Sequence, residues 1–143
     1  MTVKAILCGK GYDVATIEPS ATLTAAIKIL AERRIGALVI TGPDQRIVGI
    51  LSERDIVRTL AERGPDVLSE PLADVMTRKV VTCSQGDTVC EIMERMTSGK
   101  FRHIPVVEQG RLIGIVSIGD IVKSRVEEME REHAALNDYI RTA

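Results

Sequence analysis

Ser52 is followed three residues later by Asp55, and Ser117 is followed in the same way by Asp120. A short apolar run precedes each serine, so each serine is expected to end a strand and begin a helix. One role of this pattern is capping, in which the hydroxyl accepts from a backbone N–H and the carboxylate reaches back. Another role is binding, because the unpaired N–H groups of a helix N-terminus favour an anion. The two roles are compatible.

Each pair lies inside a repeated phrase, "GILSERDIV" at 49–57 and "GIVSIGDIV" at 114–122. The similarity extends outward, so that Thr22 faces Thr88 in the alignment of the two parts. One residue is lost between the copies, in a polar turn, where a deletion disturbs a fold least. The chain is therefore interpreted as a tandem duplication.

Both halves are predicted to have the order β-α-β-β-α. A β-prone run (13–17 or 79–83) precedes an amphipathic helix, and two apolar runs split by a polar turn then form a hairpin. The helix prediction rests on apolar residues at positions 23, 26, 27 and 30 in one half and at 89, 92, 93 and 96 in the other. The serine phrase begins the last helix.

Proline and glycine residues mark the boundary between the halves. Two prolines and a glycine between 62 and 72 indicate a linker. The predicted divisions are a first motif with a lead-in helix at 1–61, the linker at 62–72, a second motif at 73–123 and a helical tail at 124–143. The stretch "LADVMT" is expected to be a short lead-in helix to the second motif, as "VKAILC" is to the first.

This order of elements and the duplicated Gly-hydrophobic-x-Ser-x-x-Asp-hydrophobic phrase resemble the CBS domain pair, or Bateman module. The resemblance extends from about Val3 to Lys123. It implies an α+β fold in which two CBS motifs pack about a pseudo-twofold axis, with an extended C-terminal helix in this chain. It also implies clefts that bind adenosine nucleotides.

The resemblance assigns roles to the serine phrase. Asp55 and Asp120 are expected to hold the two ribose hydroxyls, which suits a carboxylate because it accepts charge-assisted hydrogen bonds. Ser52 and Ser117 are expected on the phosphate side. For the structural alternative, in which the clefts are vestigial, both Ser-x-x-Asp units serve only as caps.

In this family adenine lies between the first strand of a half and the middle hairpin strand. The corresponding residues here are Thr16, Ile17, Ala37 and Leu38 in the first half, and Val81, Thr82, His103, Ile104 and Pro105 in the second. Most of the apolar ones would be core residues in any fold.

The halves differ in the cations that would meet phosphate. Lys100, Arg102 and His103 lie beside the second cleft, and Arg54 lies inside the first phrase, where the second phrase has Gly119. Because the clefts face each other across the pseudo-twofold axis, these groups are candidates for one shared anionic groove. Solvated surface charge is the alternative for Lys100 and Arg54, and a core histidine for His103.

Composition limits the classes of binding partner that are expected. A formal net charge of −1, with 2% aromatic residues, disfavours nucleic acid. No apolar run approaches the roughly 20 residues that span a bilayer, and the N-terminus has no signal-peptide pattern, so no membrane partner and a cytoplasmic location are expected. The three cysteines are expected to be reduced thiols.

Catalysis is not expected. The spacing of Cys83, Cys90 and His103 matches no zinc pattern, and the sequence has no Walker-type loop or paired acid and base in one local frame. We therefore expect no metal requirement and no enzyme activity. An enzyme that uses a bound dinucleotide would need a general base and a substrate pocket.

The last helix is predicted to continue into the tail, which has neither Gly nor Pro beyond Gly119. Apolar residues and one histidine recur at heptad spacing: Val122, Val126, Met129, His133, Leu136 and Ile140. A homodimer with this tail at or beyond the interface is expected.

The sequence thus predicts a regulatory module that binds an adenosine nucleotide and signals in trans to an unknown protein. AMP is the first candidate ligand, with ADP, ATP or NAD(H) close behind and S-adenosylmethionine still open. The alternative is a structural homodimerisation module with vestigial clefts.

Overall fold

The first half of the chain forms a three-stranded sheet with two helices. The computed structural model describes residues 1–142 of the 143. Strand β1 pairs in parallel with β2, and β2 pairs antiparallel with β3. The elements of this half are β1 (Thr16–Ile17), α2 (Leu23–Arg33), β2 (Ala37–Thr41), the 3-10 turn η1 (Pro43–Gln45), β3 (Ile47–Ser52) and α3 (Glu53–Arg63).

The second half repeats this order with one difference. Its elements are α4 (Val89–Gly99), β4 (His103–Glu108), β5 (Arg111–Ser117) and α5 (Ile118–Thr142). The strand expected at 79–83 is reduced to a single bridge between Cys83 and Val106. Pro105 explains this difference: in the first half the Val39 N–H bonds to Ala15 O at 3.3 Å, and proline at the matching position has no N–H to donate.

The amphipathic helices begin and end alike, which confirms the duplication at the level of local structure. Thr22 and Thr88 cap α2 and α4 with their hydroxyls. Both helices end in a left-handed residue, Arg34 at φ 55° and Lys100 at φ 58°. The predicted α+β class with two related halves is thus what the chain forms.

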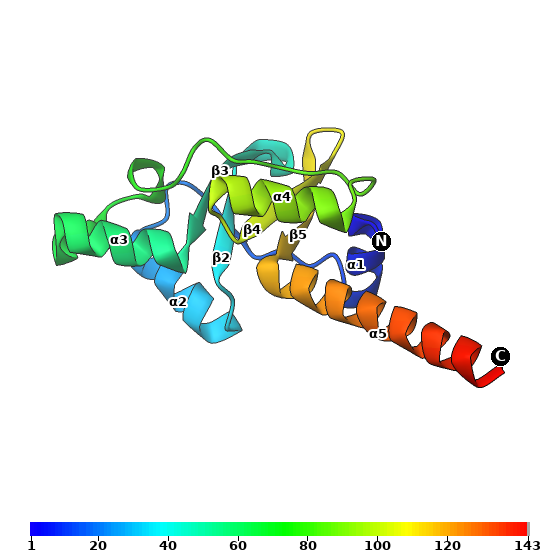
Figure 1. Ribbon diagram of the computed structural model, residues 1–143. Helices are drawn as coiled ribbons and strands as arrows, with labels where there is room; N and C mark the ends of the chain where they lie inside the picture. The colour runs from blue at the N-terminus through cyan, green and yellow to red at the C-terminus, as the bar shows by residue number, and fades with distance from the viewer. Residues whose placement is uncertain (143) are drawn as a thin grey trace.

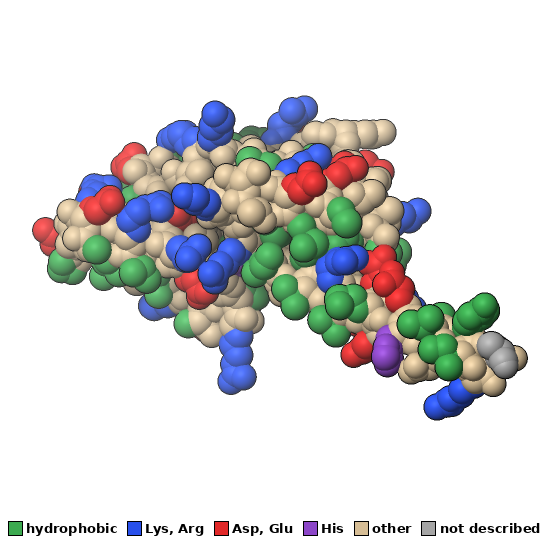
Figure 2. All heavy atoms as spheres, in the orientation of Figure 1, with side chains coloured by type: hydrophobic (Ala, Val, Ile, Leu, Met, Phe, Trp, Pro, Cys, Tyr) green, Lys and Arg blue, Asp and Glu red, His purple; other side chains and the backbone are tan. Residues whose placement is uncertain are grey.

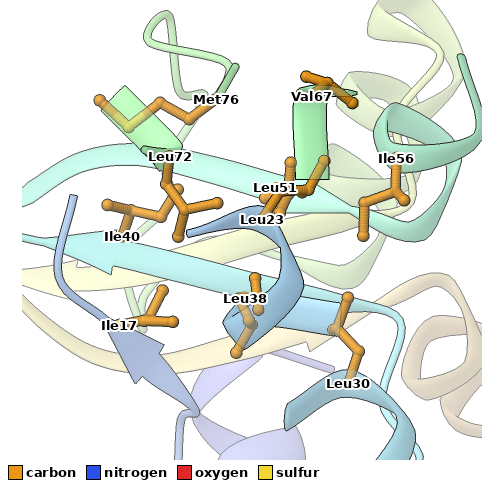
Figure 3. Packing of buried hydrophobic residues seen from close by; sticks show 11 residues of the cluster. Ile17, Leu23, Leu30, Leu38, Ile40, Leu51, Ile56, Val67, Leu72 and Met76 are labelled. Carbon is orange, nitrogen blue, oxygen red and sulfur yellow. The ribbon is translucent and has the colours of Figure 1, made fainter. Parts of the chain in front are cut away.

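The predicted linker at 62–72 is packed rather than loose. Two 3-10 turns, η2 (Pro65–Ser69) and η3 (Leu72–Asp74), stand where the linker and the second lead-in helix were expected. Val67, Leu72 and Met76 join the core of the first half (Figure 3). The segment that precedes the second half therefore completes the first.

The N-terminal helix α1 (Val3–Lys10) precedes the first half but packs against the second. The sequence divisions put it with the first motif, but its buried residues Val3 and Leu7 pack in the core of the second half. In Figure 1 it lies beside β5 and the start of α5. A single apolar stripe on a short helix must be buried against something, and the second half provides that surface.

Two matching glycines make room for these exchanged segments. A Cβ on Gly49 would overlap Met76 Sδ, and a Cβ on Gly114 would lie 2.9 Å from Leu7 Cδ2. These are the glycines that open the two repeated phrases. Their place in the repeat is explained by the close approach of a side chain from the opposite half's lead-in.

Helix α5 continues past the body of the molecule, as the sequence predicts, and projects from it (Figure 1). Its first turns contribute Ile121 to the second core, whereas the later ones are exposed. Within residues 1–142, no helix is both long and apolar enough to cross a bilayer.

Replacing Leu7 by alanine tests the exchange of lead-in segments. Leu7 is fully buried, so Leu7→Ala should reduce the free energy of unfolding by about 2–5 kcal/mol. Lys4→Ala, on an exposed position of α1, should change it by less than about 0.5 kcal/mol. Urea unfolding followed by circular dichroism measures both, and equal small effects would contradict the packing of α1.

Candidate functional site

Each serine phrase forms a complete capping box where a strand meets a helix. In the first half Asp55 N–H donates to Ser52 Oγ at 3.2 Å, and Ser52 N–H donates to Asp55 Oδ2 at 3.0 Å. Ser117 and Asp120 make the same two bonds at 3.2 and 2.9 Å. The capping role is therefore present in both halves. It occupies one carboxylate oxygen of Asp55 and leaves the hydrogen of each serine hydroxyl free to donate elsewhere.

Both phrases are also tied to the strand beside them. The first N–H of α3, from Glu53, donates to Gly36 O at 2.9 Å, and that of α5, from Ile118, donates to Arg102 O at 2.8 Å. Each helix start is thus held against the residue that enters the hairpin of its own half.

A cavity of about 540 Å³ lies at the first phrase and is shared by the two halves. This volume is within the range of about 300–1,000 Å³ that is usual for small-molecule sites. Three segments line it: the end of β3 with the start of α3, the extended chain that follows Met76, and the end of α4 with the start of β4. The lining residues are Ile50, Ser52, Glu53, Arg54, Asp55, Arg58, Thr77, Lys79, Val80, Val81, Gly99, Lys100, Phe101, Arg102 and His103.

Seven of the residues expected from the sequence meet in this cavity: Ser52, Arg54, Asp55, Val81, Lys100, Arg102 and His103. The cavity groups Arg54 from one half with Lys100 and Arg102 from the other. Arg54 thus serves the same cavity as cations that lie more than 40 residues further along the chain.

The cavity is basic. Five of its side chains are Lys or Arg, and two are Asp or Glu. Arg58 Nη2 forms an ion pair with Asp55 Oδ1 at 2.7 Å, and its side chain is 60% exposed. Arg54, Lys79, Lys100 and Arg102 are exposed and form no salt bridge with any residue in the range 1–142. The walls therefore attract an anion.

Part of the lining was not expected from the sequence. Arg58 lies one turn beyond Asp55 on α3, so its helical spacing was a usable signal. Thr77, Lys79 and Val80 enter because their segment crosses to the first half, which no local pattern indicates. Together with Ile50, Val81 and Phe101, Val80 gives one part of the cavity an apolar lining.

His103 lines this cavity and also packs against Gly36 of the first half. Gly36 leaves room for it, because a Cβ there would meet the imidazole at 3.2 Å. Burial lowers the pKa of His103 below its ordinary value, although the charge of Glu53 opposes this effect. Near pH 7 the imidazole is therefore neutral, and it can both donate and accept a hydrogen bond.

The remaining expected residues lie outside this cavity lining. Ile17 and Leu38 belong to the first core and Ile104 to the second, while Ala37 and Pro105 are also buried. Thr16 is exposed and Thr82 is half-buried. Most of the proposed adenine slot thus consists of core residues in this structure.

Asp120 and Ser117 occupy the matching position of the second half, where the surroundings differ. Lys10 Nζ donates to Asp120 Oδ2 at 2.7 Å. Burial by itself would raise the pKa of Asp120, but the hydrogen bond and charge of Lys10 and the bonds from Ser117 together hold it below its ordinary value. Asp120 is consequently an ion-paired carboxylate.

Groups suited to metal binding or covalent chemistry are not gathered here. The part of the chain from 1 to 142 contains no cluster of three or more His, Cys, Asp or Glu side chains that could hold a metal ion. Cys83 is buried in the second core, and this burial raises the pKa of its thiol to about 11. A thiol with such a pKa is protonated and unreactive at neutral pH.

Comparison with solved structures supports the fold and the repeat. A CBS-domain-containing protein from Agrobacterium tumefaciens is 44% identical with a TM-score of 0.85, covering 87% of this chain and 99% of that one. A CBS domain protein from Pyrobaculum aerophilum, complexed with AMP, is 30% identical with a TM-score of 0.74, over 84% and 89% of the two chains.

A further CBS domain pair was solved in complex with 5′-methylthioadenosine and S-adenosyl-L-methionine. It is 27% identical with a TM-score of 0.80, and the match covers 90% of this chain and 98% of that one. Among curated proteins, a mitochondrial CBS domain-containing protein of Arabidopsis thaliana is 37% identical over 123 residues, which is 83% of this chain. The chain spans 60% of that relative's length, less than two thirds of it.

The family model for the CBS domain matches this chain twice, at residues 7–62 and 72–127. These two matches cover most of the chain and coincide with the two halves of the fold. The protein therefore belongs to the CBS domain family, and its two motifs form a CBS domain pair.

Proposed function

We propose that this protein is a regulatory module that binds an adenosine nucleotide in the cavity shared by its two halves. The observation that carries the proposal is the meeting of Asp55, four cations without a salt bridge to residues 1–142, and an apolar wall in one cavity of about 540 Å³. Two related CBS structures hold AMP or other adenosine ligands, which supports this class of ligand.

Asp55 is the proposed ribose ligand. Its Oδ2 is engaged by the Ser52 N–H, and its Oδ1 faces Arg58, whose exposed side chain forms a pair of the kind worth about 0–1 kcal/mol. Ribose hydroxyls can therefore displace Arg58 at low cost. The released guanidinium is then available to the phosphate.

The phosphate is proposed to lie among Arg54, Lys100 and Arg102, with the Ser52 hydroxyl donating to it. The base is proposed to pack against Val80 and Val81, which provide apolar surface on the opposite side. Such a division, an apolar wall with a few convergent polar groups, is typical of small-molecule sites.

The excess of cations favours a nucleotide that carries phosphate. AMP remains the first candidate, with ADP, ATP and NAD(H) as further ones. S-adenosylmethionine brings a sulfonium cation into a basic cavity, where like charges repel, so we propose that it binds more weakly. The bound nucleotide would act in trans by favouring one conformation that a partner protein recognises.

A regulatory role, with no catalytic step, is proposed because the chain consists of two CBS motifs whose shared cavity is lined by cations and an apolar wall. The alternative of a dinucleotide-using enzyme would predict that copurifying NAD(H) changes its redox state with a cell extract.

Self-association is a second candidate function, and it is supported by the exposed face of α5. Val122, Val126, Met129, Leu136 and Ile140 are all exposed on this helix, and Figure 2 shows apolar side chains along its projecting part. They follow the heptad spacing that buries such a seam against another helix. We propose a homodimer that uses this surface.

Nucleotide binding is tested by thermal-shift titration with AMP, ADP, ATP, NAD+, NADH and S-adenosylmethionine. AMP at 100 times its dissociation constant should stabilise the ligand-free protein by about 2.7 kcal/mol, and Asp55→Ala should lose this shift. Asp120→Ala removes the matching capping box, which should lower the free energy of unfolding by about 0.5–2 kcal/mol. It should nevertheless keep the stabilisation by AMP. If both variants respond to AMP like the parent, the aspartates are caps alone.

Homodimer formation is tested by light scattering at micromolar concentration. We expect twice the chain mass for the parent and for Ala135→Glu, whose position faces away from the seam. Met129→Glu and Leu136→Glu put a charge into the seam and should give monomers. A monomer mass for the parent would contradict the proposal.

A further inference from the structure

The two aspartates of the serine phrases have partners of different origin. Asp55 pairs with Arg58 of its own helix, whereas Asp120 pairs with Lys10, which is 110 residues away in the chain. Lys10 Nζ also donates to the carbonyl oxygen of Ile115 at 2.8 Å. The ammonium group thus has two acceptors beside the position that corresponds to the proposed ribose site, and it shares Asp120 Oδ2 with the Ser117 N–H.

The residue that corresponds to Ile115 in the first half is Ile50, and its backbone is satisfied differently. Thr77 N–H donates to Ile50 O at 3.0 Å, and Ile50 N–H donates to Thr77 O at 2.9 Å. The lead-in to the second half is extended at this point, so its own backbone makes both hydrogen bonds to the strand β3. No side chain is needed there, and the Asp55 cavity stays open.

The lead-in to the first half is still helical at this point. Helix α1 runs to Lys10, and Gly11 N–H closes its last turn on Leu7 O at 2.7 Å. The helical backbone therefore offers no N–H to β5, and the Lys10 side chain donates to the Ile115 carbonyl oxygen instead. Because Val3 and Leu7 anchor α1 in the second core, Lys10 is held over Asp120.

The two ion pairs also differ in how easily a ligand could replace them. The Arg58 side chain is 60% exposed and has one acceptor, whereas the Lys10 side chain is 33% exposed and has two. Removing Lys10 would leave both Asp120 and the Ile115 carbonyl without this donor. An unsatisfied, partly buried acceptor is unfavourable, so displacement of Lys10 costs more.

We propose that Lys10 is a built-in occupant of the second ribose position and limits the protein to one adenosine ligand per chain. This inference rests on the proposed function, since it concerns the same class of ligand. The second position also has fewer cations: Gly119 and Gly36 stand where the first cavity has Arg54 and Arg102, while Arg34 and Lys123 correspond to Lys100 and Arg58. Once opened, it would suit an uncharged adenosine.

The test is the number of ligands bound per chain in Lys10→Met, which keeps the aliphatic stem and removes the ammonium. Equilibrium dialysis with 5′-methylthioadenosine, which is uncharged, should give about one per parent chain and about two per Lys10→Met chain. Lys4→Met, on the same helix, removes an exposed lysine and should match the parent. The double variant Lys10→Met/Asp120→Ala should return to the parental number.

The outcomes separate this inference from the proposed function. Binding of two ligands by the parent, or no gain in Lys10→Met, overturns the role of Lys10 and leaves the first cavity intact. Binding by Lys10→Met alone, lost in the double variant, supports the role of Lys10 and overturns the first site. Absence of binding in all four proteins overturns both.

A second readout needs no ligand. The Lys10 ion pair contributes stability that is present above the ordinary pKa of an aspartate and is lost as pH falls through the lowered pKa of folded Asp120. Lys10→Met should therefore raise the pKa of Asp120, whereas Lys4→Met should leave it unchanged. A pH titration of the carboxyl NMR signal measures this pKa. An unchanged pKa in Lys10→Met would show that the pair is not formed in solution.

Discussion

Among the side chains that the two halves exchange, two cover the glycines of the repeated phrases, and the candidate site is built around them. Met76 lies over Gly49 and Leu7 lies over Gly114, each in space that a Cβ would fill. Both are apolar and buried, so burial of apolar surface holds the exchanged segments in place. The residues that follow Met76 then reach Asp55, and Lys10, at the end of the helix that carries Leu7, reaches Asp120. Packing between the halves thus decides what each aspartate faces.

The same exchange gives the two related halves different surroundings for their aspartates. After Met76 the chain is extended and leaves a cavity, lined by cations from both halves, beside Asp55. Helix α1 instead continues to Lys10, which binds Asp120 and the Ile115 carbonyl. A duplicated phrase with identical caps therefore gives one open, basic site and one site that the protein's own lysine fills. The proposed regulation by a nucleotide therefore belongs to the first cavity.

Much of the fold was predictable because it depends on local patterns. Periodicity identified α2 and α4, and the repeat identified the hairpins and both capping boxes. The loss of the first strand in the second half could also have been foreseen, since Pro105 has no N–H to donate. The exchange of lead-in segments could not, because a glycine does not indicate which distant side chain will cover it. Without that exchange, neither Lys79 and Val80 in the cavity nor Lys10 on Asp120 could be placed.

The central claim is that an adenosine nucleotide binds between the halves at Asp55 and not at Asp120. An NMR titration of the uniformly ¹⁵N-labelled, ligand-free protein with AMP tests it most directly, because each backbone amide reports on its own surroundings. The account predicts that the largest shifts fall in 50–58, 77–81 and 99–103, and that 115–120 change little. Shifts centred on 115–120, or none at saturating AMP, would contradict it.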